Sequence, residues 1–172
     1  MIVATSCVAD IVFVIDNSGS IREKGDGNWI LMLGFLKAIV SDLTIAPNGT
    51  RIAAVDFGNE GHLDFGFSDY SIGDAVKAAI DRIPYRGENT NMTGGLKVAR
   101  QQVFEPTAAQ RPGVDRAIIL ITDGVPTWDA DKLDAEVYTI KNSGIRIVTL
   151  GVTNQVRMPE HRRVFDRRNH SH

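Results

Sequence analysis

The stretch ADIVFVIDNSGS, residues 9–20, decides the fold of this chain, because a continuous apolar run ends abruptly at Asp16 and two serines follow it. Such a run of β-branched and aromatic residues is typical of a parallel strand that is buried on both faces. The segment DRAIILITDG, residues 115–124, has the same pattern and ends in Asp123 and a glycine. The two segments predict two buried strands, each with a carboxylate at its end.

The rest of the chain alternates between helix and strand patterns. Apolar residues at helical spacing predict helices over 28–43, 71–84, 92–104 and 129–144, and further strand patterns cover 51–58, 62–67 and 145–152. A short link that contains glycine and asparagine joins 51–58 to 62–67, which predicts a hairpin and one antiparallel edge strand. The alternation implies an α/β fold: a doubly wound, mostly parallel sheet with helices on both faces.

Length and charge exclude several classes of protein. The chain has 172 residues and 43% hydrophobic content, which is sufficient for one sizeable core. A formal net charge of -2 leaves no basic field that would attract nucleic acid, so no nucleic-acid partner is expected. The longest apolar runs, such as 117–121, are far shorter than the ~20 residues of a membrane-spanning helix, and no membrane insertion is expected.

The two strand-end aspartates predict a metal site. In a doubly wound sheet, ligands bind beyond the carboxyl ends of the strands, where Asp16 and Asp123 can converge although they lie far apart in the sequence. Oxygen ligands without a neighbouring His or Cys favour magnesium, calcium or manganese over zinc or copper. Two aspartates and three neutral hydroxyls would leave the cation able to attract one more carboxylate from outside. This chemistry favours a binding site over a storage site.

Three short motifs carry a family resemblance. The segments DNSGS at 16–20, NMTGG at 91–95 and ITDG at 121–124 resemble the three parts of the metal-ion-dependent adhesion site of von Willebrand factor type A domains. The resemblance covers residues 8–153 and includes the order of strands and helices. It implies the fold of those domains and a metal ion bound at the carboxyl edge of the sheet.

The resemblance also implies a ligand set and a partner. The hydroxyl ligands of a Mg²⁺ ion, with Ca²⁺ or Mn²⁺ as alternatives, would be those of Ser18, Ser20 and Thr93. Asp16 and Asp123 would bind the ion directly or through water. A Glu or Asp of a protein partner would complete the octahedron. Two plainer interpretations remain at this stage: Thr93 could cap its helix, and Asp-x-Ser-x-Ser alone is also common turn chemistry.

The segments 87–104 and 142–154 are most similar to A domains of extracellular matrix proteins, such as matrilins, collagen VI and molluscan byssal or shell matrix proteins. This resemblance predicts a secreted adhesion module with collagen or another matrix component as its partner. Because the chain begins without a visible signal peptide, an intracellular A domain in a multiprotein assembly is the alternative, and a truncated non-binding remnant is another. No GxGxxG, GxSxG, HExxH or P-loop motif is present, so an enzyme is not expected.

The two ends of the chain depart from the family pattern. We divide the chain into an N-terminal flank at 1–7, the A domain at 8–153 and a basic tail at 154–172 that is expected to be disordered. The family continues with a further strand and a C-terminal helix, which are predicted to be missing here. Family members commonly join a cysteine before the first strand to one after the last helix, and here Cys7 has no such second cysteine. Self-association through Cys7 or an exposed sheet edge is therefore expected.

Two further residues are candidates for function. Trp128 follows the predicted metal site and could contact the partner, as aromatic residues at binding hot spots do, or pack against its own loop. Asn48 lies in the sequon NGT within a predicted turn and is a glycosylation candidate if the chain is secreted.

Overall fold

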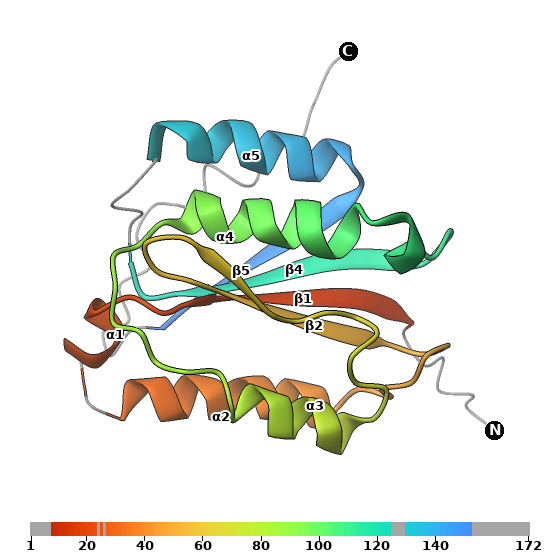
Figure 1. The fold of residues 1–172 in the computed structure, drawn as a ribbon, viewed down its shortest axis with the longest axis horizontal. Helices are drawn as coiled ribbons and strands as arrows, with labels where there is room; N and C mark the ends of the chain where they lie inside the picture. The colour runs from red at the N-terminus through yellow and green to blue at the C-terminus, as the bar shows by residue number, and fades with distance from the viewer. Residues whose placement is uncertain (1–7, 24, 26, 125–129, 153–172) are drawn as a thin grey trace, which may run out of the picture.

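The computed structural model describes residues 8–23, 25, 27–124 and 130–152. Figure 1 shows one central sheet between two layers of helices. The strands of the sheet are β1 (Ala9–Asp16), β2 (Arg51–Phe57), β3 (Gly61–Phe65), β4 (Asp115–Thr122) and β5 (Ile145–Gly151). Their order across the sheet is β3-β2-β1-β4-β5. Only β3 is antiparallel to its neighbour, so the predicted doubly wound sheet with one antiparallel edge strand is confirmed.

The helices cover both faces of the sheet. They are α1 (Ser20–Glu23), α2 (Asn28–Ser41), α3 (Gly73–Ile80), α4 (Met92–Val98) and α5 (Ala130–Asn142), with a π-helical turn at Ala99–Phe104 and a 3-10 turn at Thr107–Ala109. In Figure 1, α4 and α5 lie over one face and α2 and α3 lie over the other. This arrangement explains why β1 is apolar from Ile11 to Ile15: its last five residues are buried because it has a strand on each side and helices above and below.

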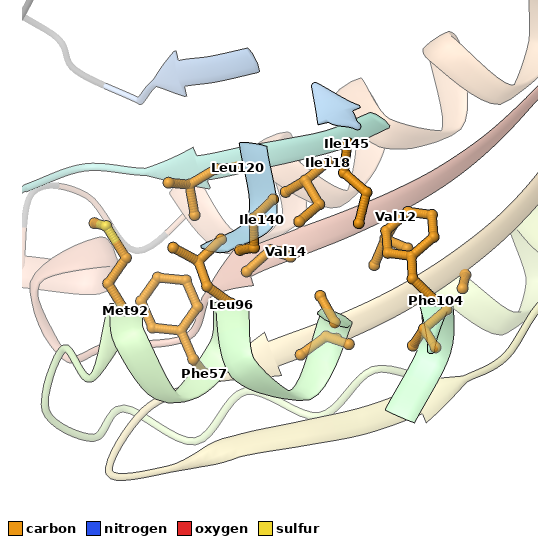
Figure 2. Packing of buried hydrophobic residues seen from close by; sticks show 14 of the residues in the cluster. Val12, Val14, Phe57, Met92, Leu96, Phe104, Ile118, Leu120, Ile140 and Ile145 are labelled. Atoms are coloured by element: carbon orange, nitrogen blue, oxygen red, sulfur yellow. The ribbon is translucent and has the colours of Figure 1, made fainter. Parts of the chain in front are cut away.

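The core on the α4 and α5 face brings helix α4 very close to β2. Figure 2 shows Leu96 of α4 packed with Val14, Leu120 and Ile140 from the sheet and from α5. A Cβ atom at Gly95 would lie 2.8 Å from the side chain of Phe57, so a glycine is required where the helix crosses the end of β2. The first turn of α4 is thereby held at the carboxyl edge of the sheet.

Two helices differ from their predicted ranges. Helix α3 begins at Gly73 rather than at Ser71, and its N-cap is Ile72 in an extended conformation without a side-chain hydrogen bond. The helix predicted over 92–104 is α-helical only to Val98 and continues as a wider π-helical turn. Apolar periodicity predicts which face of a helix is buried, but it does not determine its caps or the width of its turns.

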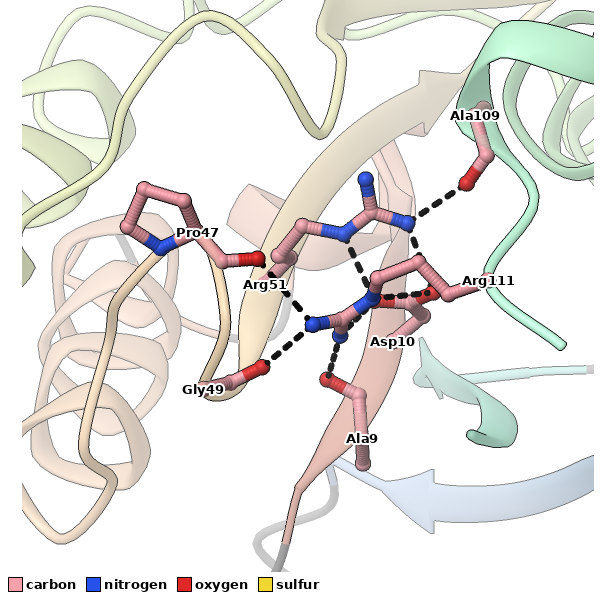
Figure 3. A network of polar contacts seen from close by, with 7 residues as sticks. All are labelled: Ala9, Asp10, Pro47, Gly49, Arg51, Ala109 and Arg111. Carbon is pink, nitrogen blue, oxygen red and sulfur yellow. Dashed lines mark hydrogen bonds and ion pairs between the residues drawn. The ribbon is translucent and has the colours of Figure 1, made fainter. Parts of the chain in front are cut away.

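At the amino edge of the sheet, a network of charged residues joins three segments of the chain. Figure 3 shows Asp10 of β1 between the guanidinium groups of Arg51 on β2 and Arg111 on the loop before β4. The two arginines also donate hydrogen bonds to backbone carbonyl groups, which are those of Ala9, Pro47, Gly49 and Ala109. This Asp10 network closes the end of the sheet opposite to the predicted metal site.

The predictions for the chain ends lie outside the described residues. These are the flank at 1–7 with Cys7 and the tail at 154–172, so the domain bounds, the missing strand and helix, and self-association all stay predictions. Within the ranges that the structure describes, β5 is the last strand at its side of the sheet. The same ranges contain no helix with the length and apolar character needed to cross a membrane.

Candidate metal centre

The carboxyl ends of β1 and β4 bring the two predicted aspartates together. The strands are parallel neighbours, with Ile15 opposite Ile121, so both chains leave the sheet at the same point. Asp16 and Asp123 are buried there, with 0% and 8% of their surface exposed. Asp16 is the last residue of β1 and Asp123 directly follows β4, so their positions are set by the sheet itself.

A chain of hydrogen bonds joins four of the five predicted ligand residues. The Ser18 amide donates to Asp16 Oδ1 at 3.0 Å, and the Ser18 and Ser20 hydroxyls lie 3.0 Å apart. The Ser20 hydroxyl donates to Asp123 Oδ1 at 2.9 Å. The site loop, which we define as residues 16–20, is thus closed onto the end of β4 through its own side chains.

The fifth predicted residue, Thr93, is buried in the first turn of α4. It does not cap the helix: the cap is Asn91, whose side-chain oxygen accepts a hydrogen bond from the Gly94 amide at 2.8 Å. The capping role considered for Thr93 is therefore wrong. Gly95 packs on Phe57, which lies opposite Asp16 in the sheet register, and this contact places the first turn of α4 at the edge that carries the site loop.

Burial and the like charge of Asp123 both disfavour the ionised form of the Asp16 carboxylate. Burial raises its pKa, hydrogen bonds from Ser18 and Thr122 lower it, and the neighbouring charge of Asp123 raises it further, so that the pKa lies above its ordinary value. A bound cation would lower the pKa of Asp16 again, because a cation favours the charged form of both carboxylates. The electrostatics of the site therefore fit a cation.

The donor set also fits a hard divalent ion. All the predicted ligand atoms are carboxylate or hydroxyl oxygens, which suit Mg²⁺, Ca²⁺ or Mn²⁺. Over the described ranges, no group of three or more His, Cys, Asp or Glu side chains is arranged to hold a metal ion. A metal ion at this edge would therefore depend on the serine and threonine hydroxyls as well as on the two aspartates.

The site opens into a surface pocket of about 620 Å³. Ser18, Ser20 and Asp123 lie in its wall together with Glu23 and Glu88. A side chain from another molecule can therefore approach Ser20 and Asp123 from solvent, whereas Asp16 and Thr93 are buried and do not lie in the wall of the pocket.

Sequence reasoning missed Asn17 and Thr122. The Thr122 hydroxyl donates to Asp16 Oδ2 at 2.6 Å and orients that carboxylate from the neighbouring strand. The buried Asn17 side chain donates to Asp56 and to the carbonyl of Pro84, and it accepts from the Arg86 amide. The sequence shows only that Asn17 and Thr122 are polar residues within two of the motifs. It does not show their hydrogen-bond partners, because these partners lie in other segments of the chain.

Neither of the two remaining candidates, Trp128 and Asn48, is tested by the structure. Trp128 lies outside the described residues, so its contact with a partner stays a prediction. Asn48 is exposed in the turn before β2, where an oligosaccharide could be accommodated, and its glycosylation also stays a prediction. Asn91, whose sequon NMT lies beside the site, donates its side-chain amide to the carbonyl of Asn59.

Comparison with proteins of known sequence identifies the family. The sequence model of the von Willebrand factor type A domain matches residues 10–170, which extends beyond the predicted domain end at 153. The chain is similar to the collagen alpha-6(VI) chain of Mus musculus, with 33% identity over 144 residues that cover 84% of this chain and 6% of the collagen chain. It therefore corresponds to a small part of that relative.

Comparison with solved structures agrees with the family match. The fold is similar to proximal thread matrix protein 1 from the mussel byssus with a zinc-occupied MIDAS motif, at a TM-score of 0.78 and 34% identity, over 87% of this chain and 37% of that chain. It is also similar to the manganese-loaded TRAP protein of Plasmodium vivax, at a TM-score of 0.76 and 21% identity, over 96% of this chain and 65% of that chain, a likeness of fold alone. The chain belongs to the von Willebrand factor type A domain family.

Proposed function

We propose that this domain is an adhesion module that uses a divalent metal ion to bind an acidic side chain of a protein partner. The observation that carries the proposal is the chain of hydrogen bonds from Asp16 through Ser18 and Ser20 to Asp123, at the wall of an open pocket. These contacts hold oxygen ligands from two strands at one point before any ion binds. Preorganised oxygens at a solvent-accessible edge are what such a site requires.

We propose Mg²⁺ as the ion, with Ca²⁺ or Mn²⁺ as alternatives. The hydroxyls of Ser18, Ser20 and Thr93 would hold it, and Asp16 and Asp123 would bind directly or through water. When bound, the ion supplies a coordination position for a partner's carboxylate. The likeness to a zinc-occupied MIDAS structure supports a divalent metal without selecting among these ions.

The relatives support a place in the extracellular matrix. The similarity to a collagen VI chain and to a thread matrix protein favours a secreted protein and a matrix partner, for which collagen is our first candidate. We propose that the domain binds and does not catalyse, because the site residues are suited to hold an ion and a carboxylate. A solid-phase binding assay on collagen, with and without EDTA, tests the choice of partner.

Calorimetric titration tests the metal site. We expect protein stripped with EDTA to bind Mg²⁺ and Mn²⁺, and Asp16→Ala to bind them more than tenfold more weakly, a loss above about 1.4 kcal/mol. Because Asp16 is buried, circular dichroism must show that the variant is folded. Ser20→Ala repeats the test at a half-buried hydroxyl, and Ser41→Ala, which alters an exposed serine of α2, is the matched control. Absence of cation binding by wild type at millimolar concentration would refute the proposal.

Replacing Thr93 separates ligation from structure. We expect Thr93→Ala to weaken Mn²⁺ binding by about tenfold, because a ligand hydroxyl is lost, while the free energy of unfolding falls by only about 1–2 kcal/mol. Titration calorimetry and urea denaturation measure the two effects. Thr139→Ala, at an exposed threonine of α5, is the control. Global unfolding of Thr93→Ala would show that the hydroxyl has a structural role instead.

A further inference from the structure

An irregularity in the edge strand places an additional carboxylate behind the site. Strands β2 and β3 pair Ala54 with Phe65 and Val55 with Leu63, so Asp64 is an extra residue without an opposite partner. Such a β-bulge turns a side chain away from its regular direction, and bulges commonly occur next to functional sites. Here the bulge brings the Asp64 carboxylate beside Asp56, whose backbone amide donates a hydrogen bond to it.

The surroundings of Asp64 are unusual for a carboxylate. Its Oδ2 atom and the Nε2 atom of His62 are both buried, and neither has a hydrogen-bond partner in the described structure. Burial raises the pKa of Asp64 to about 7, and the charge of Asp56 adds to this rise, whereas Arg86 opposes it. Asp64 therefore gains or loses its proton near neutral pH, while most carboxylates are fully ionised there.

The groups next to Asp64 hold the site loop in place. Arg86 Nε donates to both carboxylate oxygens of Asp56, at 3.2 and 3.1 Å. The same carboxylate accepts a hydrogen bond from Asn17 at 2.9 Å, and the Arg86 amide donates to Asn17 Oδ1 at 2.8 Å. Asn17 lies between Asp16 and Ser18. The backbone carbonyl group of Asn17 accepts hydrogen bonds from the amides of Gly87 and Glu88, which lie in the wall of the same pocket as Ser18 and Ser20.

Few other charges act on this cluster. On the elements packed against β3, the remaining charged side chains are Arg51 on β2 and Lys97 on α4. Arg51 pairs with Asp10 at the opposite end of its strand, and Lys97 is exposed. The charges that act on Asp64 are those of Asp56 and Arg86.

We propose that Asp64 is a proton-sensitive positioning element for the metal site: its ionisation weakens the hold of Asp56 and Arg86 on Asn17 and the site loop. When Asp64 is protonated, Arg86 faces one carboxylate. When Asp64 is ionised, two carboxylates compete for the same guanidinium, and Arg86 shifts away from Asp56 together with its own amide. The effect on metal binding rests on the proposed function, whereas the effect on the loop does not.

Nuclear magnetic resonance tests the loop without metal. We expect the amide signals of Asn17, Gly87 and Glu88 to shift with one common midpoint, equal to that of the Asp64 side-chain carbonyl carbon and near 7. In Asp64→Asn these shifts should be absent. Asp42→Asn, at an exposed aspartate after α2, should retain them. The inference is overturned if Asp64 titrates in the ordinary acid range, or if the three amides do not follow it.

Measurements of Mn²⁺ affinity test whether the ionisation of Asp64 weakens metal binding. At about pH 8.5, we expect Asp64→Asn to bind Mn²⁺ several-fold more tightly than wild type, and at about pH 5.5 the two should bind equally. Loss of a distant negative charge by itself weakens cation binding, so tighter binding separates positioning from simple electrostatics. Weaker or unchanged Mn²⁺ binding by Asp64→Asn at high pH would show that ionisation of Asp64 does not weaken the metal site. Absence of Mn²⁺ binding in all variants would refute the proposed function. In that case the titration of the loop amides still tests the effect of Asp64 on the site loop.

Discussion

Replacing Asp10 with alanine is expected to lower the free energy of unfolding by about 3–5 kcal/mol, because it leaves two largely buried guanidinium groups without their shared carboxylate. The side chains of Asp10 and Arg51 are 2% and 12% exposed, and Arg111 approaches the same carboxylate from the other side. Burial alone would raise the pKa of Asp10, but the hydrogen bonds and charges of Arg51 and Arg111 outweigh it and the pKa lies below its ordinary value.

Urea denaturation at neutral pH measures this loss, with Asp115→Ala as the control. Asp115 pairs with Arg146 on the surface, where both side chains are more than half exposed, and such pairs contribute about 0–1 kcal/mol. Because the pKa of Asp10 is lowered on folding, its contribution is present above its unfolded value of 3.8 and is lost only as the pH falls below that value. Equal losses for the two variants would show that the Asp10 network does not stabilise the fold.

The opposite pH dependence is expected from Asp64. Its pKa rises from 3.8 in the unfolded chain to about 7 in the folded protein, so the folded state binds more protons between these values. The contribution of Asp64 to the free energy of unfolding therefore falls as the pH rises from about 4 to about 7, and it is constant above that range. Asp64→Asn removes this fall, and at about pH 8 it should be more stable than wild type by roughly 2–4 kcal/mol.

Chemical denaturation of metal-free protein over this pH range measures the difference. Asp16 also has a raised pKa, so the wild-type curve alone contains more than one contribution. The difference between wild type and Asp64→Asn isolates Asp64, because Asp16 is unchanged in both. Asp69→Asn, at an exposed aspartate beyond the same strand, is the control and should follow wild type. Parallel curves for wild type and Asp64→Asn would contradict the prediction.

Much of the fold could be predicted from local patterns. The apolar run before Asp16 indicated a strand buried on both faces, and β1 indeed has a strand on each side. The hairpin of β2 and β3 was predicted from its short polar link, and its pairing is antiparallel. The bulge at Asp64 could not be predicted, because it depends on how β3 fits its neighbour and not on alternation within β3.

The residues of the candidate site could be predicted from the sequence, but the residues that hold them in position could not. The motif residues Asp16, Ser18, Ser20 and Asp123 are brought together by the sheet, as expected for strand ends in a parallel fold. The capping role considered for Thr93 was wrong because Asn91 takes that position.

The sequence by itself determined the class of the fold and the family and predicted the candidate oxygen ligands, because all three follow from short-range patterns: apolar periodicity and motifs of a few adjacent residues. Only the tertiary structure decided what surrounds these ligands. Asn17 with Asp56 and Arg86 behind the site, and Asp10 between Arg51 and Arg111 at the other end, involve partners from separate segments. Such contacts form only when the sheet brings distant strands and loops together, and burial and neighbouring charges then act together on the pKa of Asp10 and of Asp64.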